Sequence, residues 1–225
     1  MNNSDSFDPR HCLTLVELLR QRSIQQPAAV AYTFLVDGGS EQMSVTYGQL
    51  DRQARAIAAQ LQQRQARGTR AVLLYPPGLD FIAAFFGCLY AGVVAVPLYP
   101  PRRNQKVNRL QGAIQNADVK FALTTTDTLT AIEQSTSLVP ELIEIECITT
   151  DNIDLDRATD WQALLLQAGD LAFLQYTSGS TAAPKGVMVS HGNLLHNSSS
   201  IYQAFGHSDR SRVVSWLPAL PRIWV

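Results

Sequence analysis

A cluster of small hydroxyl residues around one glycine has the composition of an anion-binding loop. The stretch from Gln175 to His191 reads QYTSGSTAAPKGVMVSH, and its segment from Thr177 to Ala183 contains two Thr, two Ser and one Gly. Backbone N–H and side-chain O–H groups in such a loop can converge on a phosphate, because glycine lets the backbone approach closely. Lys185 adds a compact positive charge just after the turn. The sequence therefore predicts a loop that binds the phosphates of a nucleotide.

Two other interpretations of this stretch are a plain surface loop and a Walker A loop. Ser/Thr/Gly clusters are common in surface loops and linkers, but this one follows an apolar run and precedes Pro184-Lys185-Gly186. A Walker A loop requires G-x-x-x-x-G-K-[ST]. Gly179 and Gly186 lie seven positions apart and Lys185 precedes its glycine, which excludes Walker A. For each hydroxyl taken singly, a local turn hydrogen bond stays as the alternative.

The segment TSGSTAAPKG resembles the phosphate-loop signature of the adenylate-forming superfamily, which includes acyl-CoA synthetases, luciferases and peptide-synthetase adenylation domains. The family commonly has Gly where this chain has Ala182. Two further segments, YPPGLDF from Tyr75 and GVVAVPLYPP from Gly92, are similar to the fatty acyl-AMP ligase branch in particular. The resemblance runs from about Leu13 to Pro218, nearly the whole chain.

This resemblance implies an ATP-dependent ligase, in which a fatty acid carboxylate attacks the α-phosphate of ATP to give an acyl-adenylate and pyrophosphate. The phosphates, with Mg²⁺ neutralising their charge, would lie against the loop. The residues implied are the hydroxyl donors Thr177, Ser178, Ser180 and Thr181, the close-approach glycines Gly179 and Gly186, and the cation Lys185. No catalytic residue and no metal ligand is assigned within the chain. An acyl carrier protein is a candidate acceptor. A CoA ligase, an amino-acid adenylating domain and a non-catalytic module that binds a nucleotide or a partner chain stay open.

The last residues depart from the family's pattern after Trp216-Leu217-Pro218. The family continues with an aromatic residue, a His and an acidic residue, whereas this chain reads ALPRIWV from Ala219 to Val225. If those codons are GCC-CTA-CCA-CGA-ATA-TGG-GTT, removal of one C restores Ala-Tyr-His-Glu-Tyr-Gly, which indicates a single-base frameshift. We therefore expect residues 1–225 to form a partial N-terminal AMP-binding domain that is inactive alone. The rest of that domain and the small C-terminal domain would be absent.

The composition limits which partners and which cellular compartment are expected for this chain. A net charge of −1, with 46% hydrophobic and 16% charged residues, is typical of a globular protein and gives no reason to expect nucleic acid as a partner. The three cysteines and four histidines show neither a disulfide framework nor metal-ligand spacing, so a reducing cytoplasm is expected. The uncharged run from Phe81 to Val96 is shorter than a membrane span and contains two glycines, so no span is expected.

Alternating helix and strand patterns predict an α/β fold with a mostly parallel sheet flanked by helices. Helices are expected at 13–25, 46–65, 79–91, 104–116, 127–134 and 190–205, with a further one around Trp161. Strands are expected at 29–36, 42–45, 71–75, 93–98, 119–124, 142–148, 171–176, 187–189 and 213–217. Thr46 with Gln49 forms a capping box, and Ser190 caps the last helix. The strand 171–176 leads directly into the loop, which places the loop at the carboxyl edge of the sheet, where ligands bind.

Overall fold

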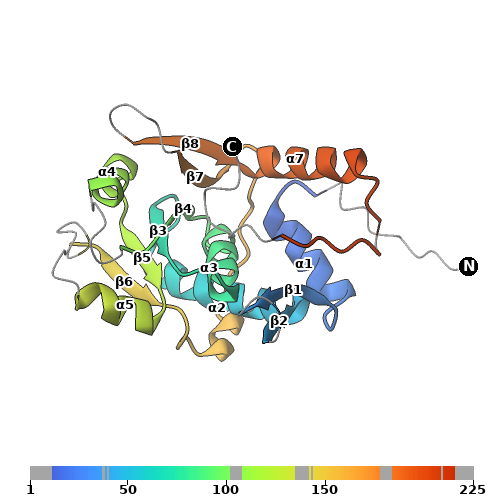
Figure 1. Ribbon diagram of the computed structural model, residues 1–225, viewed down its shortest axis with the longest axis horizontal. Helices are drawn as coiled ribbons and strands as arrows, with labels where there is room; N and C mark the ends of the chain where they lie inside the picture. Colours follow the sequence, from blue (N-terminus) through green and yellow to red (C-terminus); the bar gives the residue numbers. More distant parts are fainter. Residues whose placement is uncertain are drawn as a thin grey trace, which may run out of the picture.

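The computed structural model describes residues 12–36, 39, 41–101, 108–134, 142, 144–177, 184–208 and 210–215. Its helices are α1 (Leu15–Gln25), α2 (Tyr47–Gln63), α3 (Leu79–Tyr90), α4 (Asn108–Ala117), α5 (Thr126–Glu133) and α7 (His191–Ala204), with one 3-10 helix, η2 (Leu155–Thr159). Its strands are β1 (Val30–Leu35), β2 (Gln42–Thr46), β3 (Arg70–Leu74), β4 (Val94–Leu98), β5 (Phe121–Thr124), β6 (Glu146–Thr149), β7 (Leu171–Thr177) and β8 (Lys185–Ser190). Figure 1 shows their arrangement.

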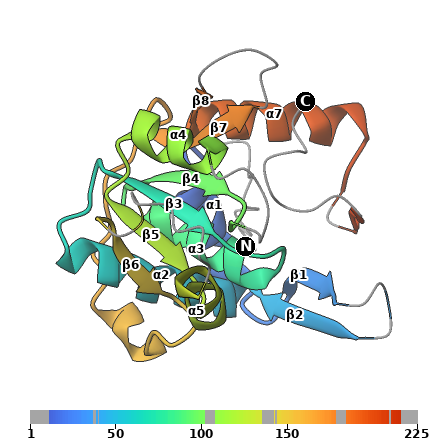
Figure 2. The same cartoon turned by 60° about the vertical axis from the view of Figure 1, so that its left-hand side comes forward.

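The strands form one six-stranded sheet and one separate hairpin. The large sheet has the order β6-β5-β3-β4-β7-β8, in which all neighbours are parallel except the last pair. Strands β1 and β2 pair antiparallel and project from the body of the molecule (Figure 2). The predicted α/β class and mostly parallel sheet are therefore confirmed.

Helices cover both faces of the large sheet. Successive residues of a buried strand point to opposite faces, so each strand contributes side chains to two separate cores. Ala71, Leu73 and Tyr75 belong to a core shared with α1, α2 and α3, whereas Val72 and Leu74 belong to a core shared with α4 and α5. The chain thus forms a three-layer α/β structure. The predicted α2 stripe is buried in the first core: Leu50, Ala54, Ile57, Ala58 and Leu61.

Capping signals set the start of two helices as the sequence predicted. Thr46 Oγ1 accepts a hydrogen bond from Gln49 N at 3.2 Å, and Gln49 Oε1 accepts from Thr46 N at 2.9 Å. The same reciprocal arrangement joins Ser190 and Asn193 at the start of α7. Each box satisfies two N–H groups that a helix start leaves without a partner.

Three elements differ from the prediction. The strand expected at 142–148 is shorter and shifted: Leu142 is helical, residues 144–145 form a bend, and β6 runs from Glu146 to Thr149. Residues 213–215 of the expected strand 213–217 have no regular structure, and the other two lie outside the described residues. The 151–167 connection has its helix at η2, before Trp161 rather than around it, because Asp154 caps it by accepting from Asp156 N at 2.9 Å. Trp161 instead donates its indole N–H to Tyr90 O at 3.1 Å. Its interactions are tertiary, which helical periodicity does not reveal.

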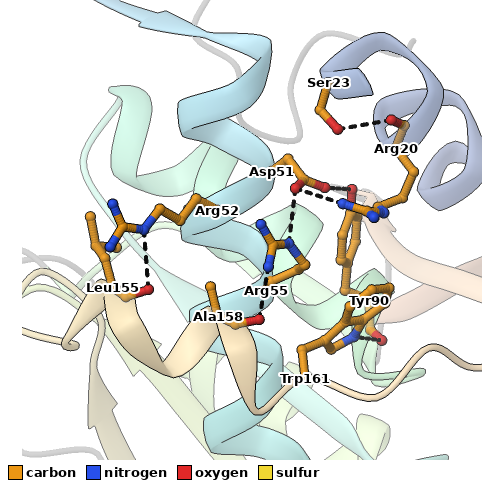
Figure 3. A network of polar contacts seen from close by, with 9 residues as sticks. All are labelled: Arg20, Ser23, Asp51, Arg52, Arg55, Tyr90, Leu155, Ala158 and Trp161. Atoms are coloured by element: carbon orange, nitrogen blue, oxygen red, sulfur yellow. Dashed lines mark hydrogen bonds and ion pairs between the residues drawn. The ribbon is translucent and has the colours of Figure 1, made fainter. Parts of the chain in front are cut away.

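A buried ionic cluster joins three helices and the 151–167 connection (Figure 3). Asp51 in α2 has a side chain only 4% exposed; its Oδ2 accepts from Arg20 at 2.8 Å and from Arg55 at 2.9 Å. Its Oδ1 accepts from the hydroxyl of Tyr90 in α3 at 2.9 Å. Burial, with the Asp51 charge adding to it, raises the pKa of Tyr90. Trp161 packs against Tyr90 and lies under the Arg20 guanidinium, so the cluster fastens α1 to the rest of the fold.

Helices α2 and α3 pack closely because α3 has a glycine at their contact. A Cβ added at Gly87 would lie 2.5 Å from Ile57 Cγ2.

Within the described residues, no helix combines the length and apolarity needed to cross a bilayer. None of the three cysteines, all of which the structure describes, forms a disulfide; Cys12 and Cys88 are buried, whereas Cys147 on β6 is exposed.

Candidate functional site

The predicted phosphate loop joins β7 to β8 at the carboxyl edge of the parallel sheet. Because β7 runs parallel to β4 and β8 runs antiparallel to β7, the loop leaves the edge where β3, β4 and β5 end. Thr177 is the last paired residue before the loop, and its partner Lys185 is the first paired residue after it. This is the edge at which open α/β sheets bind ligands.

The structure describes three of the seven predicted site residues. Thr177 ends β7, and Lys185 and Gly186 begin β8, so the hairpin pairs Thr177 directly with Lys185. Ser178, Gly179, Ser180 and Thr181 lie outside the described residues. The placement of the two ends agrees with the expected position of the loop; the roles of the seven residues stay predictions.

Lys185 is the predicted cation of this site. Its side chain is exposed, and no ion pair or side-chain hydrogen bond engages it within the part of the chain that the structure describes. The alternation of β8 places Lys185 and Val189 on one face of the sheet and Gly186 on the other. Val189 packs against the core of α1, α2 and α3, so Lys185 stands on that side of the hairpin with its charge open to an anion.

Tyr176 lies on the opposite face of the hairpin, toward α4. It pairs with Gly186, and its ring covers that glycine: a Cβ at residue 186 would lie 2.9 Å from Tyr176 Cζ. The Tyr176 hydroxyl donates to Asn116 Oδ1 in α4 at 2.7 Å. Burial raises the pKa of Tyr176, while the nearby Arg70 lowers it to a smaller extent. Gly186 therefore leaves room for the ring of Tyr176.

Pro184, at the far end of the loop, lies against the same helix. A Cβ added at Gly112 in α4 would lie 3.0 Å from Pro184 Cγ and 3.2 Å from its Cδ. Sequence reasoning did not single out Asn116 or Gly112. The one available signal was a glycine inside an otherwise helical pattern, which often marks close approach by another segment.

Polar groups continue along the same edge beyond the hairpin. The Tyr75 hydroxyl shares a hydrogen bond of 2.8 Å with Thr150 Oγ1, and Asp151 accepts from the backbone N–H of Thr126 at 3.0 Å. Burial, aided by the Asp151 charge, raises the pKa of Asp80 at the start of α3. These contacts link the ends of β3, β5 and β6.

A cavity of about 300 Å³ lies at the opposite, amino-terminal edge of the sheet. Its lining includes Gly68, Val94, Asp170 and His191, and none of the predicted site residues. His191 is 2% exposed, and its Nδ1 accepts from Leu15 N at 3.4 Å. Burial lowers the pKa of His191, and the Asp170 charge opposes this shift. The histidine thus contributes to the contact between α1 and α7.

No three His, Cys, Asp or Glu side chains gather as potential metal ligands among the described residues. The described part of the chain therefore offers no cluster of side chains that could hold Mg²⁺ by itself.

Comparisons with known proteins show which family this chain resembles. Residues 19–220 match the model of the AMP-binding enzyme family. The chain is 45% identical over 209 residues to the medium-chain-fatty-acid–[acyl-carrier-protein] ligase JamA of Moorena producens, covering 91% of this chain and 35% of that protein. It is 35% identical over 218 residues to the long-chain-fatty-acid–AMP ligase FadD26 of Mycobacterium marinum, covering 91% and 36%.

A solved structure is similar over nearly the whole chain. The fatty acyl-adenylate ligase from L. pneumophila, crystallised in complex with acyl adenylate and pyrophosphate, matches with a TM-score of 0.84 and 40% identity, covering 93% of this chain and 36% of that one. The chain thus spans about a third of the length of these relatives. On the match of its sequence and the agreement of its sheet, the chain belongs to the AMP-binding enzyme family.

Proposed function

We propose that this chain supplies the phosphate-binding part of an ATP-dependent fatty acyl-AMP ligase. In the reaction, a fatty acid carboxylate oxygen attacks the α-phosphorus of ATP. A P–O bond forms to the acyl group as the bond to the β-phosphate breaks, so that acyl-adenylate and pyrophosphate result. The observation that carries the proposal is the hairpin that pairs Thr177 with Lys185 at the carboxyl edge of the sheet.

The chain's own residues would act on the departing pyrophosphate. Lys185 would place a positive charge beside the β- and γ-phosphates, and charge-assisted bonds of this kind are stronger than neutral ones. The hydroxyls of Thr177, Ser178, Ser180 and Thr181 would donate to phosphate oxygens, and Gly179 and Gly186 would allow the backbone to come close. Mg²⁺ would enter with ATP and neutralise phosphate charge.

The relatives support a fatty acid as the substrate and an acyl carrier protein as the acceptor. JamA is a ligase of a medium-chain fatty acid and an acyl carrier protein, and FadD26 is a ligase of a long-chain fatty acid and AMP. Both names point away from CoA as the first acceptor. A cytoplasmic site of action fits this chemistry, because ATP and carrier protein are available there.

Binding of pyrophosphate to the 225-residue chain tests the proposal directly. Titration calorimetry should detect binding, and Lys185→Ala should weaken it about tenfold or more, since a hydrogen bond to a charged group contributes about 1.5–3 kcal/mol. Lys120→Ala is the matched control, because Lys120 is also an exposed lysine but pairs with Asp118. A folded chain that binds no pyrophosphate, or equal loss in both variants, would overturn the proposal.

The acyl specificity and the acceptor are tested on the reading frame that restores the family's pattern after Pro218. With ATP and fatty acids of increasing length, its product should form acyl-AMP without CoA and pass the acyl group to a carrier protein. Formation of a CoA thioester instead would refute the branch assignment. The frameshift itself stays a prediction, which a genomic read across codons 218–225 would test.

A further inference from the structure

Both ends of the phosphate loop contact one helix, α4, which otherwise covers the sheet. Tyr176, one residue before Thr177, reaches Asn116 on this helix, and Pro184, one residue before Lys185, lies against Gly112. The two contacts come from opposite ends of the loop and involve positions four residues apart on α4, which lie on one face of a helix. The loop is thus fixed at both ends to a common support.

We propose that Tyr176, Asn116, Gly112 and Pro184 form a latch, here named the α4 latch, that positions the phosphate loop for the pyrophosphate group. This inference rests on the proposed function of the loop. It makes Tyr176 and Asn116 positioning residues, which act on the phosphates through the loop and do not touch them.

The contacts of Tyr176 go beyond simple packing. Its ring already fills the space over Gly186 and joins the core of α4 and α5, and a phenylalanine would fill that space equally well. The hydroxyl adds a short bond of 2.7 Å to Asn116 Oδ1. Tyr176 therefore ties β7, β8 and α4 together at the point where the loop begins.

Pro184 restrains the other end in a different way. Its fixed φ removes one backbone freedom from the residue that leads into β8, and its ring lies so close to Gly112 that a Cβ there would push it away. A loop whose ends are fixed loses less conformational freedom when a ligand orders it, so less binding free energy is lost to ordering. If the latch opens, apparent affinity falls in proportion to the fraction of loops in the competent state.

Two variants separate the latch from general stability. Tyr176→Phe removes only the hydroxyl and should weaken pyrophosphate binding about fivefold, the equivalent of about 1 kcal/mol. Gly112→Ala should strengthen helix α4, because Ala is favoured over Gly in helices, yet its Cβ must displace Pro184. We expect it to weaken pyrophosphate binding about threefold while the unfolding temperature does not fall, a combination that loss of stability cannot produce.

Hydrogen exchange gives the second readout. In Tyr176→Phe, exchange of backbone amides should rise in segment 176–187 and stay unchanged in β3, and Asn116→Asp, which keeps an acceptor for the hydroxyl, should preserve the protection. Tyr75→Phe is the matched control: it also removes a hydroxyl bonded at 2.8 Å at this edge, and it should leave pyrophosphate affinity unchanged.

The outcomes distinguish failure of the latch from failure of the function. If the unaltered chain binds no pyrophosphate, the proposed function fails. If the unaltered chain binds it and both Tyr176→Phe and Gly112→Ala bind equally well, the latch is refuted while the function stands. Equal loss of pyrophosphate affinity in Tyr176→Phe and Tyr75→Phe would also refute the latch, because the loss would then come from lower stability of the fold.

Discussion

Replacement of Asp51 by Asn should be among the most damaging single-atom changes in this chain. The asparagine keeps the shape of the side chain but puts an amide where a carboxylate oxygen accepted hydrogen bonds. Arg20 and Arg55 both donate to Oδ2, and Tyr90 donates to Oδ1. Whether the amide nitrogen takes the place of Oδ1 or of Oδ2, a donor then faces other donors. The loss of the carboxylate charge also leaves the two guanidinium groups without their counter-ion.

The magnitude follows from how far this cluster is buried. Removing one partner of a buried ion pair costs about 3–5 kcal/mol of folding free energy. The side chain of Asp51 is 4% exposed, but those of Arg20 and Arg55 are 34% and 24% exposed, so solvent screens part of the loss. We therefore expect a loss of about 3 kcal/mol, which corresponds to about 6–12 °C in the unfolding temperature of a domain of this size.

Urea unfolding followed by circular dichroism and tryptophan fluorescence measures this difference. Asp156→Asn is the matched control, because it removes an exposed ion pair with Arg52, which lies on α2 next to Asp51. The side chains of Arg52 and Asp156 are 50% and 83% exposed. Such a pair contributes about 0–1 kcal/mol. If Asp51→Asn loses less than about 1 kcal/mol of unfolding free energy, or no more than the control, the buried cluster does not stabilise the fold more than an exposed ion pair does.

Three further predictions concern packing, protonation and thiol access. Gly87→Ala should lower the free energy of unfolding by about 1–3 kcal/mol, because its Cβ would overlap Ile57 where α2 meets α3; an unchanged urea midpoint would contradict this. Burial lowers the pKa of His191 in the folded state, so its contribution to stability should be fully present above about pH 6.5 and be lost as pH falls below that value through the lower pKa of the folded state. His191→Gln should flatten this part of the pH profile of the urea midpoint, and an unchanged slope would contradict the assignment. In the native chain one thiol, Cys147, should react with an aromatic disulfide reagent, while buried Cys88 should react only after unfolding; rapid reaction of more than one thiol would show that the core opens readily.

Local signals in the sequence were sufficient for most of the fold. The capping box at Thr46 and the cap at Ser190 depend on residues close in sequence, and both helices start as predicted. The reciprocal bond from Asn193 to Ser190 was not predicted. The apolar stripe of α2 depends on helical spacing alone, and all of it is buried. The order of the strands, in contrast, was outside the reach of periodicity, because pairing joins segments that are distant along the chain.

Residues defined by tertiary contacts were missed for the same reason. Asp51 was not singled out from the sequence; its one local signal was Arg55, four residues later. Trp161 suggested a helix, but its partner is the carbonyl of Tyr90, far away in the sequence. In the site, the composition of the loop pointed to Thr177 and Lys185, whereas Asn116 and Gly112 become relevant only when α4 packs beside the hairpin.

The position of β4 in the sheet has a consequence for synthesis on the ribosome. Strand β4 pairs with β3 on one side and with β7 on the other, although β5 and β6 come between β4 and β7 in the chain. Roughly seventy residues separate the end of β4 from the start of β7, so at about 5–20 residues per second the second edge of β4 stays open for roughly 4–14 s. An apolar strand with a free edge is a template for wrong pairing during that interval. A nascent chain stalled before residue 171 should therefore recruit chaperones more strongly than one stalled after β7 has emerged.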